Sequence, residues 1–589
     1  MENIDIARTF HDIADLLEIK GENPFRVRSY RNAAQVIEGL PEPIERMVKE
    51  NEGRIETIPG IGKSIHEKVA EIVRTGTCQF KGELLAELPE GLLDILQLQG
   101  VGPKKVRFMY KSLGIASVDE LHRAVKAHRL HDLPGMGEKS EEKILRAIKD
   151  MKKREGRFRL SLALSYAEAL IEYIREIPGV IDISSAGSLR RWRESIGDID
   201  ILVTCDGGSS AIEPVMERFT EYPDVADVIA AGGTKSSVLL KNGLQVDLRV
   251  LERRDFGAAL LYFTGSKAHN IALRDRAKRM GLKVSEYGVF REGDNGRIAG
   301  ESEEEVYRAI GLEWIPPELR ENRGEIEAAI DGKLPRLVER KDIRGDLHMH
   351  TKASDGGSTI EEMAGAAMAR GYEYIAVTDH SRALTVARGL DEKRLLRQMD
   401  EVDRINSRFK VQGSRFRILK GMEVDIKSDG SLDLDEGLLR ELDVVVAAVH
   451  SKFSMGADEM TERILTAMAS GVVNIIAHPT GRIIEGRAPY PVDMKRLMEG
   501  AKRHRVTLEL NSYPDRLDLN DVNLRLAKET GVMVAISTDS HSAYHLENII
   551  YGIHTARRGW LEKKDILNTR PLKELLKILK RGNGHLDLN

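Results

Sequence analysis

The sequence predicts a multidomain protein with an all-α N-terminal region, an α+β middle region and a C-terminal α/β barrel. Three observations lead to this prediction. Amphipathic helical patterns joined by glycine-containing turns fill residues 1–155. Strand patterns of alternating polar and apolar residues then mix with helical patterns up to residue 317. From residue 341, apolar strands that end in histidine or acidic residues alternate with amphipathic helices, which is typical of repeated β/α units.

Length and composition set the outer limits. With 589 residues the chain is too long for one compact domain, and roughly three to five units are expected. The net charge of −4 gives no global basic signal, so an affinity for nucleic acid must come from local patches. The two cysteines, Cys78 and Cys205, exclude a cysteine-rich zinc site and favour a reducing compartment. No stretch approaches about 18 uninterrupted apolar residues, and we therefore expect a cytoplasmic protein without a membrane partner.

Three glycine turns, at residues 58–63, 98–105 and 133–139, repeat the pattern apolar-x-Gly-x-Gly in front of an amphipathic helix. They resemble helix-hairpin-helix motifs, in which glycines let the backbone approach a DNA strand and N–H groups at the helix start hold a phosphate with help from lysine. One such turn alone is more often an ordinary helix connection. Glu138 would repel a phosphate, so we expect the third turn to be structural. The candidate DNA-binding residues are Gly60, Gly62, Lys63, Gly100, Gly102, Lys104 and Lys105.

Two other features of the N-terminal region are suited to chemistry on DNA. Lys68 borders the buried face of the helix that carries Ile65 and Val69, and partial burial makes an amine a better nucleophile. A solvated surface lysine is the alternative interpretation. The stretch at residues 25–31 is basic and contains aromatic residues, including Tyr30, a composition suited to nucleic-acid contact.

A carboxylate-bearing strand at residues 198–203 is the most informative stretch of the chain. Asp198 and Asp200 are two residues apart on an apolar, β-prone run, so both side chains project from one face. Two like charges held this close call for a cation, and magnesium prefers one or two carboxylates together with water and substrate phosphates. On a second alternating strand, residues 245–250, Asp247 lies on the polar face and supplies a third carboxylate.

Gly187 and Ser188 precede the first of these strands and begin a short helical segment. Free backbone N–H groups, the Ser188 hydroxyl and Arg191 are suited to hold a polyphosphate there. An isolated Asp-x-Asp is more often a turn or a solvated face than a catalytic pair. A Gly-Ser turn before it and a strand-borne aspartate after it make chance the poorer explanation.

The patterns G-S-x-x-R, G-D-x-D and V-D-x-R, followed by Y-F-T-G-S, resemble the palm and thumb of a family X DNA polymerase. The resemblance implies a nucleotidyltransferase-like palm with two Mg²⁺ or Mn²⁺ ions at Asp198, Asp200 and Asp247. It implies template contact by Arg274. Ile196 departs from the pattern, because relatives of the polymerase beta type carry a serine there near the triphosphate. The implied nucleotide-binding residues are Gly187, Ser188, Arg191, Gly197, Tyr262, Phe263, Gly265 and Asn270.

The same resemblance extends to the N-terminal region. Lys68 matches the position at which polymerase beta-like relatives carry the Schiff-base lysine of a 5′-deoxyribose-phosphate lyase. The stretch that contains Tyr30 lies near the downstream 5′-phosphate in that family. The implied partners are gapped or primed DNA and deoxynucleoside triphosphates (dNTPs), and we expect the protein to act as a monomer.

Histidines and acidic residues recur at the ends of the apolar strands in the C-terminal region. Any one strand-end histidine is more often a packed residue than a ligand, but recurrence over separate strands favours a metal site. His348 and His350 lie two apart on one strand and can face one ion together. The region resembles the PHP (polymerase and histidinol phosphatase) domain, a distorted (β/α)7-type barrel that would hold up to three Mn²⁺, Zn²⁺ or Fe ions. The implied metal ligands are His348, His350, Asp355, His380, Glu423, His450, His478, Asp539 and His541.

The expected function is a template-directed DNA repair polymerase that fills short gaps, coupled to a 3′→5′ exonuclease that also suits cleavage at abasic sites. A template-independent nucleotidyltransferase is one alternative, and a metal phosphoesterase that uses the polymerase core as a DNA-binding scaffold is another. The expected domains are a helical DNA-binding and lyase-like domain (1–80), a fingers-like helical domain (81–155), the palm (156–253), the thumb (254–317), a linker (318–340), the PHP domain (341–575) and a C-terminal tail (576–589).

Overall fold

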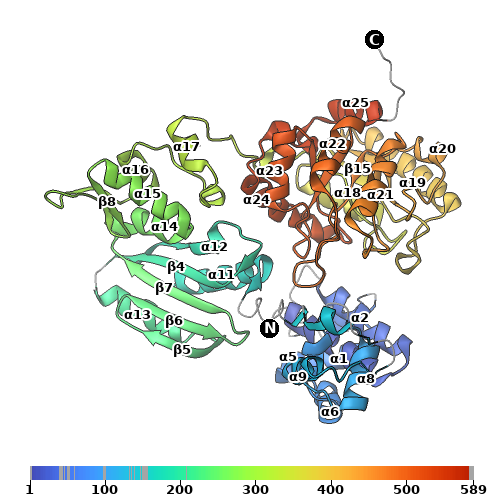
Figure 1. The fold of residues 1–589 in the computed structure, drawn as a ribbon, viewed down its shortest axis with the longest axis horizontal. Coiled ribbons are helices and arrows are strands. Elements are labelled where there is room, and N and C mark those ends of the chain that lie inside the picture. Colours follow the sequence, from blue (N-terminus) through green and yellow to red (C-terminus); the bar gives the residue numbers. More distant parts are fainter. Residues whose placement is uncertain are drawn as a thin grey trace. The chain divides into compact units, whose positions relative to one another are not determined.

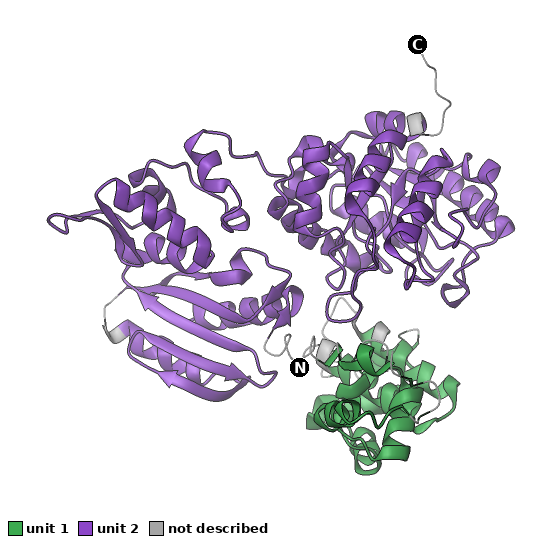
Figure 2. Cartoon of the chain, viewed as in Figure 1, with its two compact units in different colours: residues 1–155 green, residues 156–589 purple. Residues whose placement is uncertain are grey.

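The computed structural model describes residues 3–38, 44, 47–48, 53–56, 58, 60–96, 98, 101–131, 133, 136–137, 140–145, 147–148, 157–206 and 209–582, and every structural statement below concerns these residues. The chain divides into two compact units, residues 1–155 and 156–589 (Figure 2). No helix in the described ranges is both long enough and apolar enough to cross a membrane.

The first unit is helical, as the sequence predicts (Figure 1). Its helices are α1 (Asn3–Lys20), α2 (Pro24–Glu38), α4 (Gly53–Glu56), α5 (Lys63–Thr75), α6 (Gln79–Glu87), α7 (Gly91–Leu96), α8 (Pro103–Leu113) and α9 (Val118–Lys126). Ile6, Phe10 and Ile13 recur at helical spacing on α1 and are fully buried. Gly62 and Gly102 end the turns before α5 and α8, and each caps the start of its helix with extended backbone.

The second unit begins with an α+β domain built on a five-stranded sheet. Its strands are β2 (Val180–Ser185), β4 (Asp198–Cys205), β5 (Val225–Ala231), β6 (Lys235–Leu240) and β7 (Gln245–Leu251), and its helices are α11 (Leu160–Arg175) and α13 (Ser209–Thr220). The strand order is β2-β4-β7-β6-β5, and β4 runs parallel to β7. Ile199 and Ile201 of β4 pack into a core with α11 and α13. Because side chains alternate along a strand, Asp198 and Asp200 project from the opposite face.

A smaller domain follows and covers part of that opposite face. It consists of α14 (Phe256–Thr264), α15 (Lys267–Arg279), a sheet of β8 (Leu282–Ser285), β9 (Gly288–Arg291) and β10 (Arg297–Ala299), and the helices α16 (Glu303–Ala309) and α17 (Glu325–Ile330). Ala259 of α14 is buried together with Leu202 of β4. Helix α14 therefore lies on the face of the sheet that carries Asp200.

The structure corrects two of the predicted boundaries. The predicted linker, residues 318–340, buries Leu319 and Ile326 in the core of the smaller domain and forms α17. The predicted tail begins inside α25 (Leu572–Gly582), whose Leu579 is buried in the barrel core. Charged residues dominate the predicted linker, but a few apolar residues in each segment are enough to dock the chain.

The C-terminal domain is a barrel of seven parallel strands in chain order, β11 (Gly345–Asp346), β12 (Tyr374–Val377), β13 (Arg417–Asp425), β14 (Val444–Ala448), β15 (Ile475–Ile476), β16 (Thr507–Asn511) and β17 (Val534–Ser537). A parallel bridge between Met349 and Ser540 joins the continuations of β11 and β17, so the barrel is nearly closed. The surrounding helices include α18 (Ile360–Ala369), α19 (Glu392–Val411), α21 (Ala457–Ala469), α22 (Met494–His504), α23 (Asp521–Thr530) and α24 (Ile549–Arg558). Asn474, at the start of β15, donates its side-chain N–H to the carbonyl of Leu579, so α25 covers the strand starts. The strand ends remain for a functional site.

Candidate functional sites

Three aspartates meet at the edge where β4 and β7 run side by side. Asp200 is the direct cross-strand neighbour of Asp247, and Asp198 is the neighbour of Gln245. Neighbouring strands lie about 4.8 Å apart, so the carboxylates share one small surface. Burial, together with the charges of Asp198 and Asp247, raises the pKa of Asp200 to about 7. A bound cation would offset the repulsion between these carboxylates and favour the ionised form of Asp200.

Asp247 is held differently from Asp200. Burial would raise its pKa, but hydrogen bonds from Gln245 and Ser237 and the charge of Lys235 outweigh burial and lower it. The Gln245 side-chain N–H donates to Asp247 over 2.9 Å, and the Lys235 ammonium lies 3.5 Å from its carboxylate. Asp247 therefore keeps its charge while Asp200 is the proton-accepting member of the set.

The Gly-Ser turn lies directly against Asp200. Gly187 has φ +64°, and a Cβ atom placed on it would stand 2.5 Å from the Oδ2 atom of Asp200. The Ala186 N–H also donates to the Asp200 carbonyl over 2.8 Å. The turn opens a one-turn helix, α12 (Gly187–Arg190), with Ser188 half-buried in it. Only glycine both adopts this backbone and leaves room for the carboxylate.

Arg191, the expected phosphate ligand, contacts the smaller domain in this structure. Its guanidinium pairs with Glu321 over 3.0 Å and donates to the Thr264 carbonyl over 2.7 Å. Burial lowers its pKa, and Glu321 opposes the change. In this structure the Arg191 side chain therefore contacts Glu321 and Thr264, and its role in phosphate binding stays a prediction.

The Y-F-T-G-S segment forms the end of α14 and the turn after it. The Asn270 side-chain N–H donates to the carbonyl of Tyr262 over 2.6 Å and to that of Gly265 over 3.3 Å. Arg249 of β7 lies 4.4 Å from the centre of the Phe263 ring and so connects this segment to the aspartate-bearing strand. These contacts fix the backbone of the segment beside the sheet.

The remaining residues expected around the nucleotide lie as follows. Arg274 is exposed on α15. Gly197 is half-buried and lies between β3 (Ser195–Ile196) and β4. Strand β3 pairs with β1 (Phe158–Arg159). Ile196 is fully buried, so its side chain offers no phosphate contact.

The first unit gives a mixed result for the expected DNA-binding residues. Gly60, with φ +94°, and Gly62 form the turn before α5, and Lys63 and Lys104 lie in the first turns of α5 and α8. Lys105 follows Lys104 on α8, whereas Gly100 lies outside the described residues.

Tyr30 does not have the exposure that DNA contact requires. Its side chain is only 3% exposed, and its ring stacks between Phe10 and Phe80 in the helical core. The prediction of a DNA contact at Tyr30 is therefore wrong for this structure, because an aromatic residue at a buried helical position packs before it binds. Phe25, five residues earlier, is 77% exposed and lies beside the guanidinium of Arg28.

Lys68 is half-buried on α5 and contacts Ser64 and Phe80. Its ammonium donates to the Ser64 carbonyl over 3.3 Å and to the Ser64 hydroxyl over 3.2 Å. It also lies 5.2 Å from the centre of the Phe80 ring. The amine is accessible and held by weak contacts, which suits either a nucleophile or a phosphate-binding residue.

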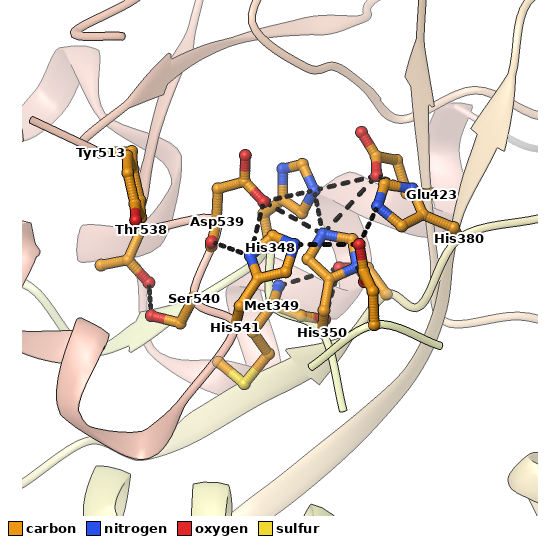
Figure 3. Close-up of polar contacts among 12 residues, drawn as sticks. His348, Met349, His350, His380, Glu423, Tyr513, Thr538, Asp539, Ser540 and His541 are labelled. Carbon is orange, nitrogen blue, oxygen red and sulfur yellow. Dashed lines mark hydrogen bonds and ion pairs between the residues drawn. The ribbon is translucent and has the colours of Figure 1, made fainter. Parts of the chain in front are cut away.

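The nine predicted ligands of the barrel come together at the strand ends. Figure 3 shows His348, His350, His380, Glu423, Asp539 and His541 of this set. Three groups have ligand atoms within 4.8 Å of one another, namely His350 with Asp355, His380 and His541, then His348 with His350 and Asp539, and then His380 with Glu423 and His450. His478 joins the third group through a 3.1 Å contact with Glu423. Because His350 and His380 each belong to two groups, the three groups form one continuous cluster.

The spacing of the donor atoms fits bound cations. The Nε2 atoms of His348 and His350 lie 3.2 Å apart, and His350 Nε2 lies 3.0 Å from Asp539. Two ring nitrogens that converge on one point repel each other unless a proton or a cation lies between them. Corners of a tetrahedron about 2.0 Å from an ion are about 3.3 Å apart, which matches these separations.

The cluster is electrostatically polarised. Burial with the neighbouring His380 and His541 charges lowers the pKa of His350 to about 4. The pKa of His380 is raised to about 10, because Glu423 and Asp355 outweigh the effect of burial. The charges of His380, His450 and His348 outweigh burial and hold the pKa of Glu423 well below its usual range. Glu423 is thus ionised and His350 is neutral at neutral pH, whereas His380 must lose its proton when it binds a cation.

Two acidic residues that sequence reasoning missed orient the predicted ligands. Glu509 of β16 contacts Nδ1 of His348 over 2.7 Å and accepts the backbone N–H of His478 over 2.7 Å. Asp425, at the end of β13, lies 3.0 Å from Nδ1 of His450. Such contacts fix which ring nitrogen faces the metal. Glu509 was detectable, since it also stands near the end of an apolar strand.

Family models match most of the chain. They are "DNA polymerase beta thumb" at residues 259–321, "Helix-hairpin-helix domain" at 1–78, "SAM-like Helix-hairpin-helix tandem" at 92–150 and "PHP domain" at 346–513. Among curated proteins, the chain is 41% identical over 586 residues to the "DNA polymerase/3'-5' exonuclease PolX" of Bacillus subtilis (strain 168). That alignment covers 99% of this chain and 100% of the relative.

Other relatives match a shorter part of this chain. A "Probable phosphatase" of Thermoanaerobacter sp. (strain X514) is 31% identical over 252 residues, which are 41% of this chain and 96% of that protein. A "Probable phosphatase" of Enterobacter sp. (strain 638) is 29% identical over 255 residues, again 41% of this chain and 96% of that protein. These relatives match over nearly their own full length but over less than half of this chain, whereas the Bacillus protein matches along the whole chain.

Proposed function

Because the chain belongs to the family X DNA polymerases that carry a C-terminal PHP domain, we propose that it fills short gaps in DNA and trims DNA 3′ ends. The observation that carries this proposal is the presence of both ligand sets in one chain, three aspartates in the palm and nine residues in the barrel. The palm is residues 156–253, the thumb follows it, and the barrel is the PHP domain. Gapped or primed DNA and dNTPs are the proposed substrates.

The palm is proposed to transfer nucleotides to a primer 3′-hydroxyl. Asp198, Asp200 and Asp247 would hold two Mg²⁺ or Mn²⁺ ions. When bound, the ions would neutralise charge on the phosphates and favour ionisation of the attacking hydroxyl. The protein's own part is to hold the carboxylates in register and to place Gly187 against Asp200, so that little reorganisation is needed during transfer.

The barrel is proposed to hydrolyse phosphodiesters at 3′ ends and at abasic sites. Its histidines and carboxylates would hold up to three Mn²⁺, Zn²⁺ or Fe ions, which supply a hydroxide-like water and stabilise the leaving oxygen. Glu509 and Asp425 keep His348 and His450 oriented. A nuclease and a polymerase in one chain meet the same 3′ ends at high effective concentration, which favours end cleaning before gap filling.

Two alternatives fit the same observations less well. A template-independent nucleotidyltransferase would share the Gly-Ser turn and the aspartates, but it does not need the helix-hairpin-helix regions. A small-molecule phosphatase is favoured by the names of the two "Probable phosphatase" relatives, but it has no use for a palm with aspartates in register. Activity on a gapped template separates both from the proposal.

A lyase activity at Lys68 is the second candidate function. The half-buried amine is positioned to form a Schiff base with the sugar aldehyde left after base excision. Borohydride should then trap a covalent protein–DNA adduct in the wild type and not in Lys68→Ala. Equal trapping in both proteins would assign the chemistry to another amine, and trapping in neither would make Lys68 a structural or phosphate-binding residue.

The direct test of polymerisation is incorporation opposite a one-nucleotide gap. The wild type should insert the complementary nucleotide with Mg²⁺, and Asp200→Ala should lose at least on the order of 10²–10³ in rate with nearly unchanged DNA binding. Insertion without regard to the template base would favour the template-independent alternative. Full activity of Asp200→Ala would remove the palm assignment.

A further inference from the structure

Two arginines stand beside the barrel cluster on separate loops. Arg487 lies in the loop after β15, and Arg516 lies in the loop after β16. Both loops leave the barrel at the strand ends, where the nine ligands also lie. The Arg516 Nε atom is 3.8 Å from the Oδ2 atom of Asp539, and its charge helps burial to lower the pKa of His478. Arg516 is thus a direct neighbour of the ligand cluster.

The positive charge of this pair is poorly compensated. The Nη1 atom of Arg516 is buried and makes no hydrogen bond with any residue in the described part of the chain. Burial, and then the Arg516 charge, lowers the pKa of Arg487, so the two guanidinium groups are close enough to repel each other. Two carboxylates lie near the pair: that of Asp539 would also bind a cation, and that of Asp518 already accepts the backbone N–H of Thr480. With cations bound, the pair would face still more positive charge and would need an anion.

Contacts with Arg482, the Gly481 carbonyl and Phe453 hold the two arginine-bearing loops in place. Arg482 donates to the carbonyl of Arg516 over 2.9 Å and to that of Leu517 over 2.6 Å. Arg487 donates its Nε–H to the Gly481 carbonyl over 2.8 Å and lies 4.0 Å from the centre of the Phe453 ring. These contacts use the loop backbone and one guanidinium edge. A half-buried guanidinium that is fixed by its surroundings, and that keeps one N–H donor without a hydrogen bond among the described residues, is a preorganised anion site.

The palm supports the same two loops. Arg159 of β1 pairs with Asp515, which is next to Arg516 in the chain, and with Glu485, two residues before Arg487. Glu194 in the palm pairs with Arg482 over 2.7 Å. The polymerase region therefore braces the loops that carry the arginine pair.

We propose that Arg516 and Arg487 bind the phosphate group of the DNA 3′ end next to the metal ligands of the barrel. This proposal rests on the proposed nuclease function and assigns two substrate-binding residues to it. Guanidinium groups bind phosphate through paired N–H donors, and two of them on different loops would fix both the position and the orientation of the phosphate.

The experiment uses the full chain with Mn²⁺, hydrolysis of the diester bis(p-nitrophenyl) phosphate, and inhibition by inorganic phosphate. Arg516→Ala and Arg487→Ala should each raise the inhibition constant of inorganic phosphate by about tenfold or more. The Mn²⁺ concentration for half-maximal activity should stay the same or fall, because a positive charge leaves the site. Arg516→Lys should bind phosphate with intermediate strength, since lysine lacks the paired donors. Arg404→Ala, which removes an exposed arginine from α19, is the matched control and should equal the wild type.

Different failures have different signatures. Wild-type phosphate inhibition in both alanine variants would overturn the inference and leave the nuclease intact. A higher Mn²⁺ requirement with unchanged phosphate inhibition at saturating Mn²⁺ would also overturn it and make Arg516 a support for Asp539. If the wild type hydrolyses no diester, the proposed nuclease function fails and this inference fails with it. If thermal melting shows that Arg516→Ala does not fold, Arg516→Lys and Arg487→Ala decide the question.

Discussion

Asp200 is a palm carboxylate whose ionised form is disfavoured by its surroundings. Burial and the adjacent carboxylates raise its pKa to about 7, so below neutral pH a proton occupies the position that a cation needs. We therefore expect Mg²⁺ to compete with this proton. The Mg²⁺ concentration for half-maximal gap filling should be about tenfold higher at pH 6 than at pH 8.

The sign of this effect follows from the direction of the pKa change. A carboxyl whose folded pKa is raised above its unfolded value holds its proton up to neutral pH, so metal affinity grows as the pH rises towards 8. Titrations of Mg²⁺ in the one-nucleotide gap assay at the two pH values provide the measurement. An equal Mg²⁺ requirement at both would show that Asp200 does not bind the ion in its ionised form.

The site residues that the sequence predicted differ from those that it missed in the structural feature that determines their positions. The grouping of the nine predicted barrel residues could be anticipated, because most of them stand at or just after strand ends and the strand ends of a barrel meet on one side. Arg516 could not, because its position depends on the path of a loop and on its bracing by Arg482. Tyr30 was misassigned because composition does not reveal which helix face is buried. Loop closure and burial are tertiary properties that a local pattern does not carry.

At the scale of elements, the turn at Gly187 leaves the space that the Asp200 carboxylate of β4 occupies. Gly187→Ala would place a methyl group 2.5 Å from the Asp200 oxygen and should displace it. We expect gap filling to fall by about 10² or more, while Mn²⁺-dependent 3′ degradation by the barrel is retained. Steady-state rates of both activities on the purified variant provide the measurement.

Gly243→Ala is the matched control for this variant. Gly243 also has a positive φ, +84°, and the nearest atom to an added Cβ is 3.9 Å away on Phe158. Both variants should lose about 1–2 kcal/mol of stability from the backbone conformation, but only Gly187→Ala should lose gap filling. Equal activities in the two variants would mean that backbone strain, and not the contact with Asp200, explains any loss.

The order and type of the elements were largely predictable, and their packing was less so. The alternation in residues 245–250 and the apolar run from Ile199 to Val203 gave the two central palm strands directly. The prediction of a linker at residues 318–340 relied on the charged residues that dominate their composition. Ile326 and Leu337 nevertheless dock this segment on the thumb, and spacing of a few apolar residues in a polar segment is a weak local signal.

At the scale of the molecule, metal binding should stabilise the unit that contains the barrel. The cluster places Glu423 and Asp539 in a buried site, where cations that bind the folded state shift the unfolding equilibrium. Saturating Mn²⁺ should raise the melting temperature of the transition from residues 156–589 by at least about 2 °C, measured by calorimetry. The double variant His348→Ala/His350→Ala should show a smaller shift. An identical shift in the double variant would place the stabilising ion elsewhere.

The central claim is that two separate metal-dependent sites in one chain perform opposite reactions on DNA 3′ ends. The decisive measurement assays gap filling and Mn²⁺-dependent 3′ degradation side by side in the wild type, Asp200→Ala and His348→Ala/His350→Ala. We predict that Asp200→Ala loses gap filling and keeps 3′ degradation, and that the histidine variant does the reverse. Retention of 3′ degradation by the histidine variant, or of gap filling by Asp200→Ala, would contradict the account.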